Sequence, residues 1–163
     1  MTDPGGSSPI PRTGLGFDVH RFSAGRPLVL GGVTFDHELG LAGHSDGDVV
    51  CHALADALLG AVALGDVGDH FPETAPAFEG IAGPALLART VRVLAEAGAH
   101  PWSCDVSVIC DRPSIAPERA AMRSALAEVL GVALENVSVK ATRPEGLGLQ
   151  PDGIGCLAIA VVV

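Results

Sequence analysis

The chain has 163 residues, of which 48% are hydrophobic, and its 10 basic and 19 acidic side chains give a formal net charge of −9. This length suits a single domain with a substantial core, and the apolar fraction excludes a disordered chain. The negative charge argues against nucleic acid or an anionic membrane as a partner, because clustered lysines and arginines bind such phosphates. An anionic substrate would therefore have to be bound through metal ions or backbone amides.

Terminal composition and cysteine spacing indicate the extent of the domain and its compartment. Residues 1–12 are rich in glycine, proline and serine and predict a flexible tail, which leaves residues 13–163 as a single domain. No run reaches the roughly 18 apolar residues of a membrane span. The cysteines lack the spacing of a metal site, so we expect a cytoplasmic protein with buried thiols at Cys51, Cys104, Cys110 and Cys156.

A strand opens the predicted domain. Over residues 13–22 apolar side chains alternate with glycines and polar residues, which is the period of a β-strand. Asp18 and His20 therefore project from the same face of this strand, opposite the apolar set. Two short apolar runs then flank Gly31 and Gly32, which predicts a β-hairpin.

A helix is predicted from about residue 46 to residue 64, where alanines and leucines form an apolar stripe. Ser45 is expected to be its N-cap, and Asp48 completes a pattern similar to a capping box. Polar residues recur every four positions and would lie along a second stripe: His44, Asp48, His52 and Asp56.

The rest of the chain mixes helices and strands. A long connection over residues 65–83 is of a length that is usually functional or mobile. Helices are expected over residues 84–97 and 117–130, and strands over residues 105–110, 137–141 and 154–163. The last strand is apolar enough to be central or interfacial. This order predicts an α/β fold of the α+β sandwich type, with a mixed sheet and helices on one face.

A candidate metal site joins the first strand to the first helix. Asp18, His20 and His52 supply one carboxylate and two imidazoles, which suit Zn²⁺ and leave a fourth position open, as in catalytic zinc sites. Taken singly, each histidine is better explained as a solvated or capping residue. The convergence of the three side chains favours the metal site.

A candidate phosphate site lies beside it. His44 and Ser45 precede the predicted helix N-terminus, where backbone N–H groups and a hydroxyl can receive a phosphate oxygen. A metal ion and a helix N-terminus together would bind phosphate without lysine.

Three motifs in chain order carry a family resemblance. Residues 16–22 read GFDVHRF, residues 43–49 read GHSDGDV, and residues 64–68 read LGDVG. From Gly14 to the C-terminus the chain resembles the 2-C-methyl-D-erythritol 2,4-cyclodiphosphate synthases of the non-mevalonate isoprenoid pathway.

This resemblance implies a fold, an assembly and a reaction. The protein would be a homotrimer of α/β subunits whose sheets face the three-fold axis, with active sites between neighbouring subunits. Zinc would be held by Asp18, His20 and His52. As a phosphorus–oxygen lyase, the enzyme would let the 2-phosphate of 4-diphosphocytidyl-2-C-methyl-D-erythritol 2-phosphate attack the β-phosphate and expel CMP.

The resemblance also implies roles for single residues. His44 and Thr142 would be catalytic, and Glu145 would bind Mg²⁺ or Mn²⁺ on the diphosphate. Substrate contacts are implied for Ser45, Asp48, Asp66, Gly68 and Phe71. Because the substrate supplies its own nucleophile, the metal ions and the positioning of the phosphates would carry the chemistry.

Residues 142–154 depart from the family pattern. Arg143 stands where a threonine is usual, and the turn before the last strand lacks an arginine that is usual there. Arg112 or Arg143 could supply replacement charge on the phosphates, and we assign Arg143 to substrate binding, although a surface arginine in a loop is an equally good interpretation. The departures leave one alternative open, a catalytically impaired trimeric homologue that binds a metal or a nucleotide. An unrelated zinc hydrolase is a third interpretation, which the ordered motifs disfavour.

Overall fold

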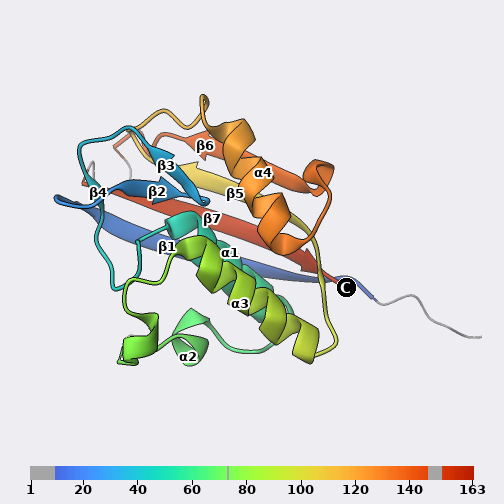
Figure 1. Cartoon of the computed structure of the whole chain (residues 1–163). Helices are drawn as coiled ribbons and strands as arrows, with labels where there is room; N and C mark the ends of the chain where they lie inside the picture. Colours follow the sequence, from blue (N-terminus) through green and yellow to red (C-terminus); the bar gives the residue numbers. More distant parts are fainter. Residues whose placement is uncertain (1–9, 73, 147–151) are drawn as a thin grey trace, which may run out of the picture.

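A mixed five-stranded sheet forms one layer of the computed structural model, and the long helices cover one of its faces (Figure 1). The structure describes residues 10–72, 74–146 and 152–163. The predicted α/β class, with a mixed sheet and helices on one face, is confirmed. In the order β4-β1-β7-β5-β6, the β5–β6 pair is parallel and the other pairs are antiparallel.

The elements have the following bounds. The main sheet contains β1 (Arg12–Ser23), β4 (Gly40–Leu41), β5 (Pro101–Ile109), β6 (Val137–Thr142) and β7 (Gly153–Val162). A separate hairpin contains β2 (Leu28–Leu30) and β3 (Val33–Phe35). The helices are α1 (Val49–Ala61), α2 (Val67–His70), α3 (Gly83–Glu96) and α4 (Arg119–Leu130), with single 3-10 turns at Pro76–Phe78 and Leu134–Asn136.

Several sequence predictions differ from these bounds. Strand β1 begins at Arg12, inside the predicted tail, whose residues 1–9 lie outside the described residues. Strand β5 begins four positions before the prediction of residue 105. The predicted long connection contains α2 and a 3-10 turn. The final strand, β7, is central in the sheet, as its apolar sequence predicts.

The first helix starts later than predicted. It begins at Val49 rather than near residue 46, and its N-cap is Asp48 rather than Ser45. The Asp48 carboxylate accepts hydrogen bonds from the N–H groups of Val50 and Cys51, which the first turn of any helix leaves without a partner. The expectation of Ser45 as N-cap is therefore wrong, because a carboxylate three residues later takes the position.

Helix α1 lies directly on strand β1, with backbone against backbone. A Cβ atom added at Gly14 would come 1.9 Å from the carbonyl oxygen of Ala57, and one at Gly16 would come 1.9 Å from that of Ala53. Both distances are far below van der Waals contact, so only glycine fits at these two positions of β1.

The opposite face of the sheet exposes an apolar set. Leu15 and Phe17 on β1 lie directly opposite Ile159 and Leu157 on β7, and Val19 extends the row. Phe17 is 50% exposed and Leu15 is 64% exposed. The alternate positions Gly14 and Gly16 face α1 and are buried. The predicted alternation is thus confirmed, with the apolar side facing outward.

Two global features complete the fold. All four cysteines are free and buried, as predicted. Within the described parts of the chain, no helix combines the length and the apolar character that crossing a bilayer would require.

The close contact of β1 with α1 predicts a sharp contrast between two glycines. Gly16→Ala should lower the free energy of unfolding by about 2–3 kcal/mol, because the new methyl group forces the helix off the strand. Gly60→Ala, on α1 where a Cβ meets nothing within 4 Å, should raise it by about 0.5–1 kcal/mol. Urea unfolding at one fixed protein concentration measures both; equal effects would contradict the packing argument.

Candidate active site

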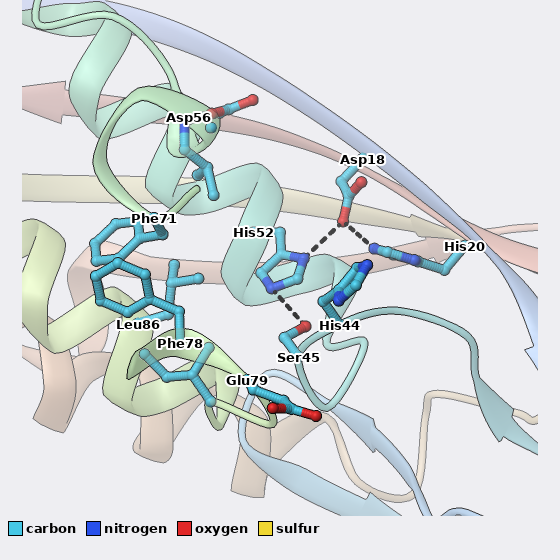
Figure 2. Close-up of a pocket in the computed structure, with 13 residues that line it drawn as sticks. Asp18, His20, His44, Ser45, His52, Asp56, Phe71, Phe78, Glu79 and Leu86 are labelled. Atoms are coloured by element: carbon cyan, nitrogen blue, oxygen red, sulfur yellow. Dashed lines mark hydrogen bonds and ion pairs between the residues drawn. The ribbon is translucent and has the colours of Figure 1, made fainter. Parts of the chain in front are cut away.

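Three side chains from β1 and α1 converge at one point (Figure 2). Oδ2 of Asp18 lies 3.0 Å from Nε2 of His20 and 3.1 Å from Nδ1 of His52. Asp18 and His20 share a face because they are two residues apart on a strand, and α1 carries His52 to them. Each can offer one ligand atom, and these atoms all lie within 4.8 Å of one another.

This group fits a tetrahedral metal ion. Ligands at about 2.0–2.1 Å from zinc are roughly 3.4 Å apart, which is close to the spacing in the structure. One carboxylate oxygen and two imidazole nitrogens form a donor set typical of catalytic zinc, and they leave a fourth position open. The predicted metal-binding group of Asp18, His20 and His52 is therefore assembled, while the structure does not identify the metal.

The charges of Asp18 and His20 are coupled. Burial by itself raises the pKa of Asp18, but its hydrogen bonds with His20 and His52 outweigh burial and hold the pKa well below its usual range. The hydrogen bond to Asp18 raises the pKa of His20 above its ordinary value, and burial opposes this only in part. Asp18 is thus ionised, and a metal ion held by the three side chains would compete with a proton for His20.

The loop before α1 carries Ser45 to the same place. The Ser45 hydroxyl lies 3.1 Å from Nε2 of His52 and accepts the N–H of Gly47 at 3.0 Å. Arg26 holds the loop from outside, because its guanidinium donates to the carbonyl oxygens of Gly43, at 2.9 Å, and Ser45. The backbone carbonyl of His44 accepts the N–H of Gly80 at 2.7 Å.

Asp48 occupies a different environment from the other motif residues. Its side chain is completely buried, and in addition to capping α1 it accepts the N–H groups of Gly31 and Gly32, each at 2.8 Å. Burial raises the pKa of this carboxyl, although the backbone hydrogen bonds oppose the shift. The structure thus places Asp48 between the hairpin and α1, away from the pocket where a substrate contact was expected.

A cavity of about 230 Å³ opens beside the three converging side chains. Its polar lining residues are Asp18, His20, His44, Ser45, His52, Asp56 and Glu79, and the others are Val67, Gly68, Phe71, Phe78, Ile81 and Leu86. Phe71 and Phe78 meet edge to face, with ring centroids 5.4 Å apart. The two sets of lining residues suit a ligand that combines anionic groups with a carbon skeleton.

The connection after α1 closes one side of this cavity. Asp66 is the N-cap of α2 and forms a capping box with Asp69. Asp56 of α1 accepts the N–H of Val67 at 2.7 Å, which fastens α2 to α1 and holds Gly68 in the cavity lining. Asp66 itself supports α2 and is not among the residues that line the cavity.

A second cavity, of about 540 Å³, lies at the ends of β5 and β6. Thr142 and Arg143 line it, together with His37, Arg112 and Arg119 and the stretch from Cys110 to Ala116. Glu145 is exposed on a turn just beyond, with a φ of 49°.

The expected catalytic pair His44 and Thr142 is divided between the two cavities of one chain. Part of the altered segment, residues 147–151, lies outside the described residues.

Sequence reasoning missed several residues that build the site. Arg26 and Glu79 gave no recognisable signal, because single charged residues in turns are common. Phe78 and Leu86 looked like ordinary apolar residues. Asp56 did carry a signal, since it belongs to the four-residue recurrence, but its helix alone does not reveal its hydrogen bond to Val67.

The fold and the Asp-His-His group together define an α/β protein with a candidate catalytic metal centre. A family model described as YgbB family matches residues 11–163, and the chain belongs to this family. It is 51% identical over 151 residues to the 2-C-methyl-D-erythritol 2,4-cyclodiphosphate synthase of Symbiobacterium thermophilum, covering 91% of this chain and 96% of that protein.

Other relatives support the same assignment. Over 158 residues the chain is 51% identical to a bifunctional enzyme IspD/IspF of Novosphingobium aromaticivorans, covering 96% of this chain but only 41% of that protein. A solved 2C-methyl-D-erythritol-2,4-cyclodiphosphate synthase in a CDP-bound form superposes with a TM-score of 0.86 at 34% identity, covering 93% of this chain and 100% of that chain. The bifunctional IspDF from Campylobacter jejuni gives 0.89 at 37% identity, covering 94% and 42%.

The coupled charges predict how zinc binding depends on pH. Because a proton on His20 competes with the metal, zinc affinity should fall by about tenfold for each pH unit below the raised pKa of His20. Above that pKa it should level off, because His20 then carries no competing proton and Asp18 is already ionised. His52→Ala should weaken binding at every pH, whereas the exposed His100 provides the control variant His100→Ala. Competition with a chromogenic chelator measures these affinities; a pH-independent affinity would refute the coupling.

Proposed function

We propose that this protein converts 4-diphosphocytidyl-2-C-methyl-D-erythritol 2-phosphate to 2-C-methyl-D-erythritol 2,4-cyclodiphosphate, with release of CMP. It would thus be a metal-dependent phosphorus–oxygen lyase of isoprenoid biosynthesis. The observation that carries the proposal is the Asp18, His20 and His52 group beside a half-polar cavity. Identity of about 50% to synthases over most of the chain supports catalysis rather than the impaired alternative.

The residues of the first cavity would position the reacting phosphates. A zinc ion held by Asp18, His20 and His52 would supply positive charge to stabilise the phosphate that faces it. The apolar wall around Phe71 packs against the carbon skeleton and excludes water, which favours attack by the phosphate of the substrate itself. His44 and Ser45 lie on the polar side, where they can contact this phosphate.

The second cavity would take the nucleotide side of the substrate. Arg112, Arg119 and Arg143 are concentrated around it in a chain of net charge −9, which supports an anionic ligand. Thr142 would contact a phosphate there, with Arg143 as the replacement for a missing threonine. We assign Mg²⁺ or Mn²⁺ on the diphosphate to Glu145, which is exposed on the turn that follows Arg143.

A homotrimer would complete the site. The apolar side chains of β1 and β7 cover the free face of the sheet, and exposed apolar surface of this kind is typical of an interface. We propose that three copies bury this face around a common axis. Contact between copies would also bring the first cavity of one chain beside the second cavity of its neighbour. Four free, buried thiols support a reducing compartment, and we place the enzyme in the cytoplasm.

The reaction predicts two products and a strict metal requirement. Zinc-loaded protein with Mg²⁺ should form CMP and the cyclic diphosphate in equal amounts, whereas zinc-depleted protein should form neither. Liquid chromatography with ³¹P NMR measures both products. Zinc binding without CMP release would favour the impaired homologue. Hydrolysis of simple phosphate esters without a cyclic product would favour the zinc hydrolase.

The trimer predicts a matched pair of surface variants. Phe17→Glu places a charge in the middle of the apolar face and should yield monomers with little activity. Leu134→Glu changes a side chain of similar exposure, 45%, on a 3-10 turn and should remain trimeric and active. Analytical ultracentrifugation determines the masses. A trimeric Phe17→Glu protein, or a monomeric wild type, would contradict the proposed interface.

A further inference from the structure

The two histidines of the metal-binding group differ in the partner of their second ring nitrogen. His20 hydrogen-bonds to the backbone of Ala42. The N–H of Ala42 already donates to the carbonyl oxygen of Arg21 at 2.8 Å, so the contact with His20 is through the carbonyl oxygen of Ala42. A carbonyl oxygen only accepts, so the His20 ring donates there with one nitrogen and contacts Asp18 with Nε2, which would offer its lone pair only to a bound metal ion.

His52 instead faces a hydroxyl, which can either donate or accept. Its Nδ1 lies 3.1 Å from Asp18, and its Nε2 lies 3.1 Å from Oγ of Ser45. In a metal-free protein with neutral His52, the proton sits on Nδ1 and is donated to Asp18. Ser45 then donates its own proton to Nε2.

This arrangement would reverse if Nδ1 held a metal ion. The lone pair of Nδ1 would then face the metal, so the ring proton would be on Nε2 and would be donated to Oγ of Ser45. Oγ also accepts the N–H of Gly47 at 3.0 Å, so both of its lone pairs are occupied. The hydroxyl proton of Ser45 must then find another acceptor, and the side chain of Ser45 lines the cavity (Figure 2).

We propose that Ser45 is a positioning residue that fixes the metal-binding tautomer of His52 and, once metal is bound, turns its own O–H toward an anionic oxygen in the cavity. This inference rests on the proposed metal-binding role of the three side chains. The Ser45 hydroxyl would make the binding of a metal ion and of an anion cooperative, because both favour the His52 tautomer with its proton on Nε2.

The surroundings keep this hydroxyl in place. Ser45 is only 7% exposed, and Arg26 holds its backbone carbonyl while a second branch of the same guanidinium holds that of Gly43. Oγ therefore stays close to His52, and the hydroxyl proton changes direction only by rotation about the Cβ–Oγ bond.

Zinc affinity of the full-length protein tests the positioning role. Ser45→Ala should weaken zinc binding by about tenfold or more, the usual effect of removing the outer hydrogen bond of a histidine ligand. Ser45→Thr keeps the hydroxyl and should restore most of the affinity. Ser23→Ala, on β1 with only a 3.5 Å contact to its neighbour Ala24, provides the control and should leave affinity unchanged.

Spectroscopy separates positioning from loss of structure. In zinc-loaded wild-type protein labelled with ¹⁵N-histidine, His52 should carry a slowly exchanging proton on Nε2, and that protection should disappear in Ser45→Ala. Inorganic phosphate should bind more tightly to zinc-loaded wild type than to zinc-free protein, and Ser45→Ala should reduce this ratio.

The outcomes distinguish this inference from the proposed function. If wild type binds zinc and Ser45→Ala binds it equally well with the same His52 spectrum, the inference fails while the synthase proposal stands. If wild type binds no zinc, both the inference and the proposed metal role fail. Loss of zinc affinity in Ser45→Ala, with recovery in Ser45→Thr, supports the inference.

Discussion

The structure depends on the direct contact of helix α1 with strand β1. At Gly14 and Gly16 the strand has no side chain, so the carbonyl oxygens of Ala57 and Ala53 occupy the space that a Cβ atom would need. Because the two backbones are in direct contact, neither can move toward the other, and protein interiors are too closely packed to leave a gap between them. The strand and the helix therefore have one possible separation and one register.

That register determines the chemistry of the site. Asp18 and His20 continue the same face of β1 just beyond the two glycines, and His52 lies one residue before Ala53 on α1. If bulky side chains separated the strand from the helix, Asp18 and His52 would be several ångströms further apart than 3.1 Å and would hold no common ion. The glycines of the first motif thus serve the metal-binding group as much as the fold.

The sequence predicted the local patterns better than the contacts between distant residues. Alternation placed Asp18 and His20 on one face, and the motifs added His52, because such signals are contained within a few neighbouring positions. It did not predict that Asp48 would be buried against the hairpin, since its partners Gly31 and Gly32 are 17 and 16 residues away. Alternation also did not predict that Phe17 would point away from the helices, because it separates the two faces of a strand without saying which face is covered.

The Asp48 carboxylate has a consequence for how the molecule opens. It accepts N–H groups from the hairpin at Gly31 and Gly32 and from the first turn of α1 at Val50 and Cys51. Neither element can detach without leaving a buried carboxylate short of donors, which is costly. The hairpin and the start of the helix therefore form one cooperative unfolding unit. Their amide protons would exchange with solvent together, at a rate set by the release of a single side chain.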